Sequence, residues 1–256
     1  MCLIGIAWQA HPEYPLIIAA NRDELHNRPT RPAQWWADTP ELFAGQDLQA
    51  GGTWLGIARS GRISLVTNIA ARPAAEAPAK SRGDLVKDWL LGGQSVEAYL
   101  GNIAANQAHY AGFSLVIGNP AGLHTFTSPG VAGKDHAVLP VGVTTMSNSP
   151  PDQVWPKAKF LEEHLSRMLS SSDPVTDKLF ALLANRDPVP ASGDPAAKHL
   201  AAVSRQLFIL HPTYGTRSST VLLIDRHRNC TVVERSFSAA GTPTGEVQTE
   251  FTLAFD

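Results

Sequence analysis

The order of the apolar segments constrains the fold of this chain more than any other feature. Short apolar runs separated by turns come in pairs, at residues 3–8 and 16–20, 51–58 and 62–68, and 113–117 and 123–126. Such pairs predict β-hairpins. Apolar residues at helical spacing occupy 84–91, 95–105, 154–169 and 177–184, and further strand-like runs lie at 141–146, 218–224, 230–237 and 247–255. Grouped hairpins and grouped helices are not the strict alternation of a parallel α/β sheet.

Two antiparallel sheets placed face to face, with helices on their outer faces, would bury every one of these apolar runs. We therefore predict an α+β fold, a four-layer αββα sandwich of two antiparallel sheets. With 256 residues, 43% of them hydrophobic, the chain is long enough to bury a full core, and we expect a single domain over residues 1–256. Residues 26–36 contain Pro29 and Pro32 and predict a surface excursion. Trp35 and Trp36 could cover a cavity there, but we expect them to pin a loop.

Composition excludes several classes of partner. The formal net charge is −2 with acids and bases mixed along the chain, so we expect no nucleic acid partner. Two distant cysteines, Cys2 and Cys230, and nine scattered histidines predict neither a disulfide framework nor a metal site. The apolar run at the chain start is too short for a membrane span or a signal peptide, which makes the cytoplasm the expected location.

Cys2 is the first candidate for chemistry, because removal of the initiator Met would leave it with a free α-amino group. A thiol has a reference pKa of about 8.5 and an α-amine one of about 7.7–8.0. The amine can therefore take the thiol proton near neutral pH, which is the chemistry of an N-terminal nucleophile. The alternative is that Cys2 is a small buried hydrophobe at the start of a strand.

Polar residues at the ends of predicted strands are the next candidates. Asn21-Arg22-Asp23-Glu24 follows the second strand and lies next to the chain start if the first hairpin closes. Asn68 ends the second hairpin in the same way. The alternative for such residues is that they cap solvated turns.

Seven segments, taken together and in order, resemble the NRDE family, the family of the transport and Golgi organisation protein. They span nearly the whole chain: Met1-Cys2, Asn21-Arg22-Asp23-Glu24, Gly51-Gly52-Thr53-Trp54-Leu55-Gly56, Thr67-Asn68, Ser81-Arg82-Gly83, Ser147-Asn148-Ser149-Pro150 and Tyr214-Gly215-Thr216-Arg217-Ser218-Ser219-Thr220. That family is similar to the N-terminal-nucleophile hydrolases, most closely the bile-salt hydrolase and penicillin V acylase group. The resemblance implies the same αββα fold.

Carried over position by position, the resemblance implies a set of site residues. The catalytic candidates are Cys2, Asp23, Asn68, Asn148 and Arg217, and the substrate-binding candidates are Asn21, Arg22 and Trp54. The acylases have an Arg immediately before the Asx-x-Asp turn, where this chain has Ala20, and Arg22 is the candidate substitute.

The implied roles agree with the chemistry of these side chains. Asp23 would hold the α-amino group, and Asn148 would orient that amine or the substrate. Asn68 would donate an N–H to the developing oxyanion, and Arg217 would lower the pKa of the thiol. If Arg217 instead pairs with an acid, and the Asn and Asp side chains only cap turns, the set has a structural role alone.

Two functions remain open. The first is a hydrolase of carbon–nitrogen amides or thioesters that passes through a Cys2 acyl-enzyme and needs no cofactor. The second, implied by the resemblance, is a ligand-binding or carrier protein on the same scaffold, for haem or for acyl-coenzyme A and acyl lipids. In the acyl-coenzyme A case the phosphates would be met by Arg22, Arg28, Arg31 or Arg217, and an apolar trench with Trp35, Trp36 or Trp54 would take the acyl chain.

Overall fold

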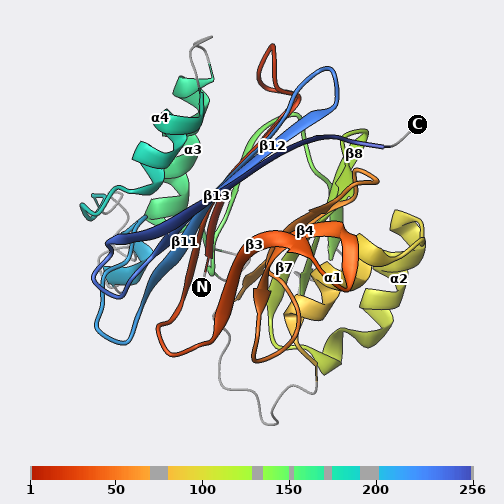
Figure 1. The fold of residues 1–256 in the computed structure, drawn as a ribbon, viewed down its shortest axis with the longest axis horizontal. Coiled ribbons are helices and arrows are strands. Elements are labelled where there is room, and N and C mark those ends of the chain that lie inside the picture. The colour runs from red at the N-terminus through yellow and green to blue at the C-terminus, as the bar shows by residue number, and fades with distance from the viewer. Residues whose placement is uncertain are drawn as a thin grey trace. The chain divides into compact units, whose positions relative to one another are not determined.

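The computed structural model describes residues 2–69, 80–128, 135–149, 153–169, 175–190 and 202–254. The chain divides into two compact units. The first unit comprises Met1–Asn27, Pro140–Ser149 and Gln153–Glu250, and the second comprises Arg28–Leu139, Pro150–Asp152 and Phe251–Asp256. Each unit contains a sheet and two α-helices (Figure 1). The expected α+β class with two antiparallel sheets is confirmed, while the single domain over residues 1–256 stays a prediction.

The first unit is built on a six-stranded sheet in the order β10-β1-β2-β11-β12-β13. Its strands are β1 (Cys2–Trp8), β2 (Leu16–Leu25), β10 (Gly142–Met146), β11 (Tyr214–Ile224), β12 (Asn229–Phe237) and β13 (Pro243–Thr252). Its α-helices are α3 (Pro156–Met168) and α4 (Val175–Leu183), which lie beside each other (Figure 1), and a 3-10 turn covers Ala202–Ser204. Strand β2 pairs antiparallel with β1 on one side and with β11 on the other.

Helix α3 lies unusually close to β1, and Gly5 permits this approach. A Cβ atom at Gly5 would lie 3.0 Å from Leu165 Cδ2 and 3.2 Å from Leu161 Cδ2. Leu161 and Leu165 are fully buried and belong to the apolar core between the helices and the sheet. The missing side chain of Gly5 therefore sets the position of α3 over the start of the chain.

The second unit is built on a seven-stranded antiparallel sheet in the order β3-β4-β5-β6-β7-β8-β9. Its strands are β3 (Thr30–Trp36), β4 (Thr39–Asp47), β5 (Leu55–Ala58), β6 (Ile63–Asn68), β7 (Phe113–Asn119), β8 (Gly122–Ser128) and β9 (His136–Val138). Its helices are α1 (Arg82–Leu91), α2 (Val96–Asn106) and the 3-10 turn Gln107–His109. Ser81 and Ser95 cap α1 and α2 by accepting hydrogen bonds from the N–H groups of Gly83 and Ala98.

The predicted surface excursion over residues 26–36 is wrong, because Thr30–Trp36 forms β3 and pairs with β4. Pro32 is tolerated since β3 is an edge strand and the pairing register shifts between Arg31 and Gln34. Trp36 is buried and donates its Nε1–H to the Ala44 carbonyl at 3.0 Å. The ring of Trp35, in contrast, lies under the Arg59 guanidinium at 3.8 Å. Of these two tryptophans, only Trp36 therefore belongs to the core of this unit.

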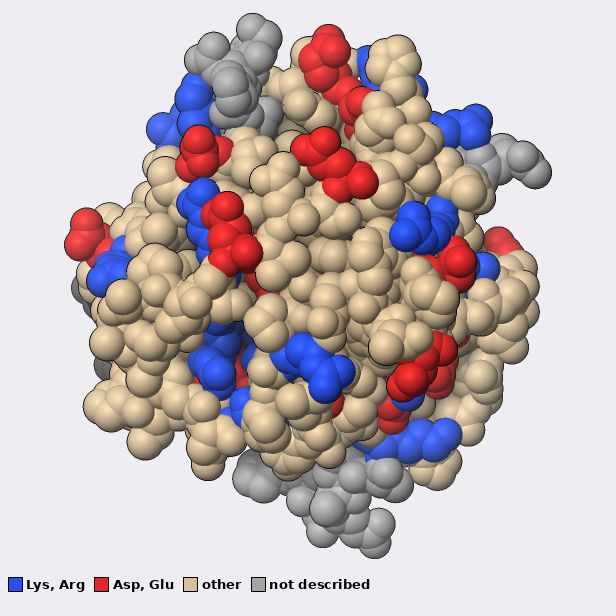
Figure 2. All heavy atoms as spheres, viewed as in Figure 1, with Lys and Arg blue, Asp and Glu red and all other residues tan. Residues whose placement is uncertain are grey.

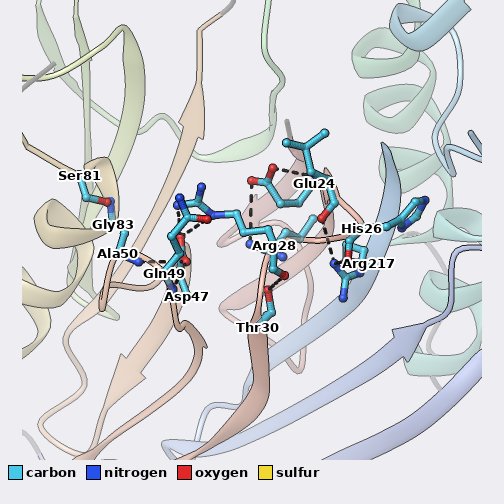
Figure 3. A network of polar contacts seen from close by, with 12 residues as sticks. Glu24, His26, Arg28, Thr30, Asp47, Gln49, Ala50, Ser81, Gly83 and Arg217 are labelled. Carbon is cyan, nitrogen blue, oxygen red and sulfur yellow. Dashed lines mark hydrogen bonds and ion pairs between the residues drawn. The ribbon is translucent and has the colours of Figure 1, made fainter. Parts of the chain in front are cut away.

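The turn after β4 is fixed by Asp47. Its Oδ2 accepts two hydrogen bonds from Arg28, from Nε at 2.9 Å and from Nη2 at 2.7 Å, and its Oδ1 accepts hydrogen bonds from the N–H groups of Gln49 and Ala50 (Figure 3).

Over the face shown in Figure 2, acidic and basic side chains of the described residues are interspersed. Among these residues, no helix has the length and hydropathy needed to cross a membrane.

Two of the glycine-containing segments singled out in the sequence meet within the second unit. A Cβ atom on Gly52 would lie 2.5 Å from the backbone carbon of Gly83, in the first turn of α1. The N–H of Thr53 also donates to the Gly83 carbonyl at 3.3 Å. The segment around Gly51 and Gly52 thus serves as the docking point for α1, which requires a residue without a side chain.

We expect Gly52→Ala to lower the free energy of unfolding by about 1–3 kcal/mol, because its methyl group would force α1 away from the turn. Gly93→Ala is the matched control, since nothing lies within 4 Å of a Cβ at that position. Urea unfolding followed by circular dichroism measures both variants. Equal stabilities of the two variants would contradict the close contact between Gly52 and Gly83.

Candidate active site

Strand pairing in the first unit places Cys2 at the start of a row of polar residues. Cys2 lies opposite Arg22 on β2, Arg22 lies opposite Ser218 on β11, and Ser218 lies opposite Ser236 on β12. Cross-strand partners share one face of a sheet. The register of β2 therefore brings the chain start beside the Asn21–Glu24 segment, as the first hairpin predicts.

The backbone nitrogen of Cys2 is held by Asn148. Strand β10 pairs Met146 with Ile4 of β1, so the chain two residues further on, at Asn148, reaches the level of Cys2. The Cys2 N–H donates to Asn148 Oδ1 at 2.7 Å, and Asn148 is fully buried. The structure thus brings together two residues that are 146 positions apart in the sequence, while the catalytic role of Asn148 stays a prediction.

Asp23 is buried and bound from two sides. Its Oδ1 accepts the Thr216 hydroxyl at 2.7 Å, and Thr216 Oγ1 in turn accepts the Ile209 N–H at 2.9 Å. Its Oδ2 lies 3.9 Å from the Nζ of Lys157 in the first turn of α3. A hydroxyl and an ammonium thus fix the orientation of the Asp23 carboxyl group.

Burial is the main influence on the protonation of this cluster. It raises the pKa of the Cys2 thiol; the Asp23 charge raises that pKa further, while Arg22 and the backbone of Asp23 lower it. Burial likewise raises the pKa of Asp23, against the lowering effects of Lys157, the Thr216 hydroxyl and Arg22. The charge of the amino terminus lowers the pKa of the thiol more than Arg22 does, and Arg22, opposite Cys2 on β2, is the side-chain cation with this effect. Arg22 also lies 3.9 Å from Glu24 through Nη2 and Oε2.

Asn21 has a structural role in the protein. Its side-chain Nδ2 donates to the carbonyls of Leu183 and Leu207, both at 2.9 Å, and its Oδ1 accepts the Ser219 hydroxyl at 2.6 Å. Leu183 ends α4, where a helix leaves carbonyl groups without partners. Both amide hydrogens of Asn21 are thus used within the protein, while the substrate-binding role implied by the resemblance stays a prediction.

Of the three remaining predicted residues, Arg217 belongs to the first unit, and Asn68 and Trp54 belong to the second. Arg217 lies at a register shift of β11 and donates from Nη1 to the carbonyls of Leu25 and His26, both at 3.0 Å (Figure 3). Asn68 ends β6 of the second unit, opposite Phe113, and the ring of Trp54 covers the face of Gly45 in that unit. The effect of Arg217 on the thiol, the oxyanion contact of Asn68 and the ligand contact of Trp54 stay predictions.

Sequence reasoning missed Lys157, and it gave no role to Tyr214 and Thr216, although both lie in a segment that carries the resemblance. Lys157 precedes Leu161 and Leu165 by four and eight residues, so it lies on the inward stripe of α3, and a lysine in an apolar stripe is a detectable signal. The charges of Asp23 and Cys2 act on the hydroxyl of Tyr214 and, together with its burial, raise its pKa. Among the described residues, no three His, Cys, Asp or Glu side chains gather in a way that would hold a metal ion.

Comparison with known proteins identifies the family of the chain. A family model described as Transport and Golgi organisation 2 matches residues 1–239. The chain belongs to this family. The mouse Transport and Golgi organization 2 homolog is 31% identical and its human counterpart 30%, and each alignment covers 99% of both chains. The family predicted from the sequence motifs is confirmed.

The fold is similar to that of N-terminal-nucleophile hydrolases. The Caenorhabditis elegans ortholog of N-acylethanolamine-hydrolyzing acid amidase matches with a TM-score of 0.51 and 11% identity, covering 87% of this chain and 92% of its own. Penicillin V acylase from Agrobacterium tumefaciens matches with a TM-score of 0.49 and 13% identity, over 98% and 86% of the two chains. At 11% identity, the likeness to the amidase shows the fold alone.

In this member of the Transport and Golgi organisation 2 family, we expect Asn21→Ala to destabilise the fold by about 3 kcal/mol, because it leaves two buried carbonyls without a donor. Asn119→Ala is the control, since the Asn119 side chain accepts a single exposed hydrogen bond from Ala121. Urea unfolding of both variants measures the difference. A loss no larger for Asn21→Ala than for the control would contradict its cross-linking role.

Proposed function

We propose that this protein is an N-terminal-cysteine hydrolase that cleaves carbon–nitrogen amide or thioester bonds through a Cys2 acyl-enzyme. The observation that carries the proposal is the hydrogen bond from the Cys2 nitrogen to Asn148, next to the buried Asp23 carboxyl group. Removal of Met1 would turn that nitrogen into an α-amino group already held in place. A general base must be positioned within hydrogen-bond reach of the proton it removes, whatever its pKa, and a fixed amine meets that condition.

The proposed reaction uses the amine as base and then as acid. The neutral α-amine takes the proton of the Cys2 thiol, and the thiolate attacks the carbonyl carbon of the substrate. The resulting ammonium returns the proton to the leaving nitrogen or sulfur as the carbon–nitrogen or carbon–sulfur bond breaks. Water, deprotonated by the same amine, then attacks the carbonyl carbon of the Cys2 thioester. The carbon–sulfur bond breaks, the acid is released, and the ammonium returns its proton to the Cys2 sulfur. Because Asn148 accepts one N–H of the amine, the nitrogen lone pair remains available to the thiol proton.

The fold supports an amide substrate without identifying one. The similar amidase is named for the hydrolysis of N-acylethanolamines, which are small amides. Fold alone does not determine function, so we carry over only the class of bond and not the substrate. We infer that the protein acts in the cytoplasm, because Cys2 and Cys230 are both free thiols, the form that a reducing compartment maintains.

We expect the protein lacking Met1 to form a covalent acyl adduct at Cys2 when mixed with a panel of activated amides and thioesters. Rapid quenching followed by intact-mass and peptide mass spectrometry detects the adduct. Cys2→Ala should abolish it, whereas Cys230→Ala should leave it unchanged, because Cys230 is fully buried and burial raises its thiol pKa. If no member of the panel acylates Cys2 in the processed protein, the hydrolase proposal is wrong.

Asn148→Ala should lower the rate of Cys2 acylation by roughly 10²–10⁴-fold, the usual contribution of a positioned general base. The amine would lose the acceptor that fixes its orientation. Asn102→Ala, at an exposed position of α2, is the control. Stopped-flow measurement of acylation gives both rates, and an Asn148→Ala rate within a few-fold of the control would rule out an orienting role for Asn148.

A carrier function on the same scaffold is the second candidate, favoured by the raised pKa of the Cys2 thiol. A thiol kept protonated by burial is a weak nucleophile. In this case the site would bind haem or acyl-coenzyme A without turnover, and Arg22 would meet anionic groups. Titration calorimetry with each ligand tests the carrier, and no binding of either would exclude it.

A further inference from the structure

Lys157 is a buried ammonium group next to the candidate site. It is fully buried as the second residue of α3, and its Nζ lies 3.9 Å from Asp23 Oδ2. The ring of Trp155 lies 5.6 Å from the same Nζ. Among the described residues, no atom accepts a hydrogen bond from Nζ. Asp23 is thus the acid with which Lys157 forms its ion pair.

The position of Lys157 is unfavourable for a lysine in three respects. A buried ammonium loses its hydration, and an ion pair without further hydrogen bonds recovers that loss poorly. The first turn of a helix carries a partial positive charge, which repels a cation. The same stripe of α3 continues with the buried Leu161 and Leu165, so a methionine or leucine would fit the surroundings without a charge. The packing of α3 therefore does not explain a lysine at this position, whereas the Asp23 carboxylate does.

We propose that Lys157 is a positioning residue that keeps the Asp23 carboxylate ionised beside Cys2. The catalytic consequence rests on the proposed hydrolase function. An ionised Asp23 can stabilise the α-ammonium formed when the amine takes the thiol proton, whereas a protonated Asp23 cannot. Lys157 also cancels the charge of Asp23, so that the carboxylate does not prevent Cys2 from ionising.

The charged and titratable groups around this pair come from the amino terminus and from four elements: Cys2 on β1, Arg22, Asp23 and Glu24 on β2, Tyr214 on β11 and Lys157 on α3. Lys157 is the strongest of the influences that oppose the burial-raised pKa of Asp23. In return, burial lowers the pKa of Lys157, while the charges of Asp23 and Cys2 raise it. The charge of each group thus favours the ionised form of the other, whereas burial opposes both charges, and the distance of 3.9 Å between Nζ and Oδ2 is that of an ion pair.

The first test is a pH titration of the Asp23 carboxyl carbon by ¹³C NMR, with its resonance assigned from Asp23→Asn. Removing a cation at this distance should raise the pKa of Asp23 by about 1–3 pH units in Lys157→Met. Lys157→Arg should restore a titration close to that of the wild type. A carboxyl titration in Lys157→Met identical to the wild type would overturn the proposal.

The second test follows the alkylation rate of Cys2 by iodoacetamide against pH, in a Cys230→Ala background that leaves one thiol. Lys157→Met should add an inflection at the new pKa of Asp23. The double variant Lys157→Met with Asp23→Asn should lose that inflection, since no carboxyl group remains. An inflection that persists in the double variant, or none in Lys157→Met, contradicts the proposal.

If Lys157→Met folds poorly, the free energies of unfolding of the variants still test the coupling between Lys157 and Asp23. The double variant removes both charges, so it should be more stable than Lys157→Met alone, as expected for coupled neighbours. If the two are equally stable, the pair is not coupled and the proposal fails. Neither titration requires turnover, so absent acylation together with the expected shifts would reject the hydrolase and leave the role of Lys157 toward Asp23 intact.

Discussion

The structure of the first unit depends on one constraint, which is that a central strand carries polar residues into a buried position. Strand β2 is paired on both sides, and Asn21, Arg22 and Asp23 on it are each at most 5% exposed. Buried polar groups need partners. Asn21 donates hydrogen bonds to the backbone carbonyls of Leu183, at the end of α4, and of Leu207. Asp23 accepts a hydrogen bond from the Thr216 hydroxyl and forms an ion pair with Lys157. The partners that these buried side chains require thus fix the positions of the helices and of the segment before β11 relative to the chain start.

The same constraint makes the surroundings of Cys2 electrostatically balanced. Asp23 pairs with Lys157 and Arg22 pairs with Glu24, so both charged β2 residues that act on the Cys2 thiol have a partner of opposite charge. Isolated buried charges would instead be neutralised by proton uptake or loss. In the proposed reaction, such pairing would favour an ionised Asp23 beside Cys2, where it could stabilise the ammonium formed when the amine acts as base.

The sequence predicts the elements whose signals are local, and it misses the features that depend on distant partners. Paired apolar runs predicted the hairpin of β1 and β2, and helical spacing predicted α3 and α4, because each signal lies within a few residues. Strand β3 was missed because prolines disfavour strands except at a sheet edge, and the edge is a property of the whole sheet. The structural role of Asn21 was missed because its acceptors, Leu183 and Leu207, lie more than 160 residues away. Motif resemblance, rather than periodicity, supplied Asn148.

The nitrogen bound by Asn148 is the centre of the proposed chemistry, and its chemical state is open to a direct measurement. Intact-mass spectrometry of the purified native protein, with sequencing of its N-terminal peptide, reports whether the chain begins at Cys2. We expect the mass to be lower than that of the full sequence by one methionine residue, with an unblocked α-amino group on Cys2. A chain that retains Met1, or an acetylated Cys2, would leave no amine to act as the base and would contradict an N-terminal nucleophile.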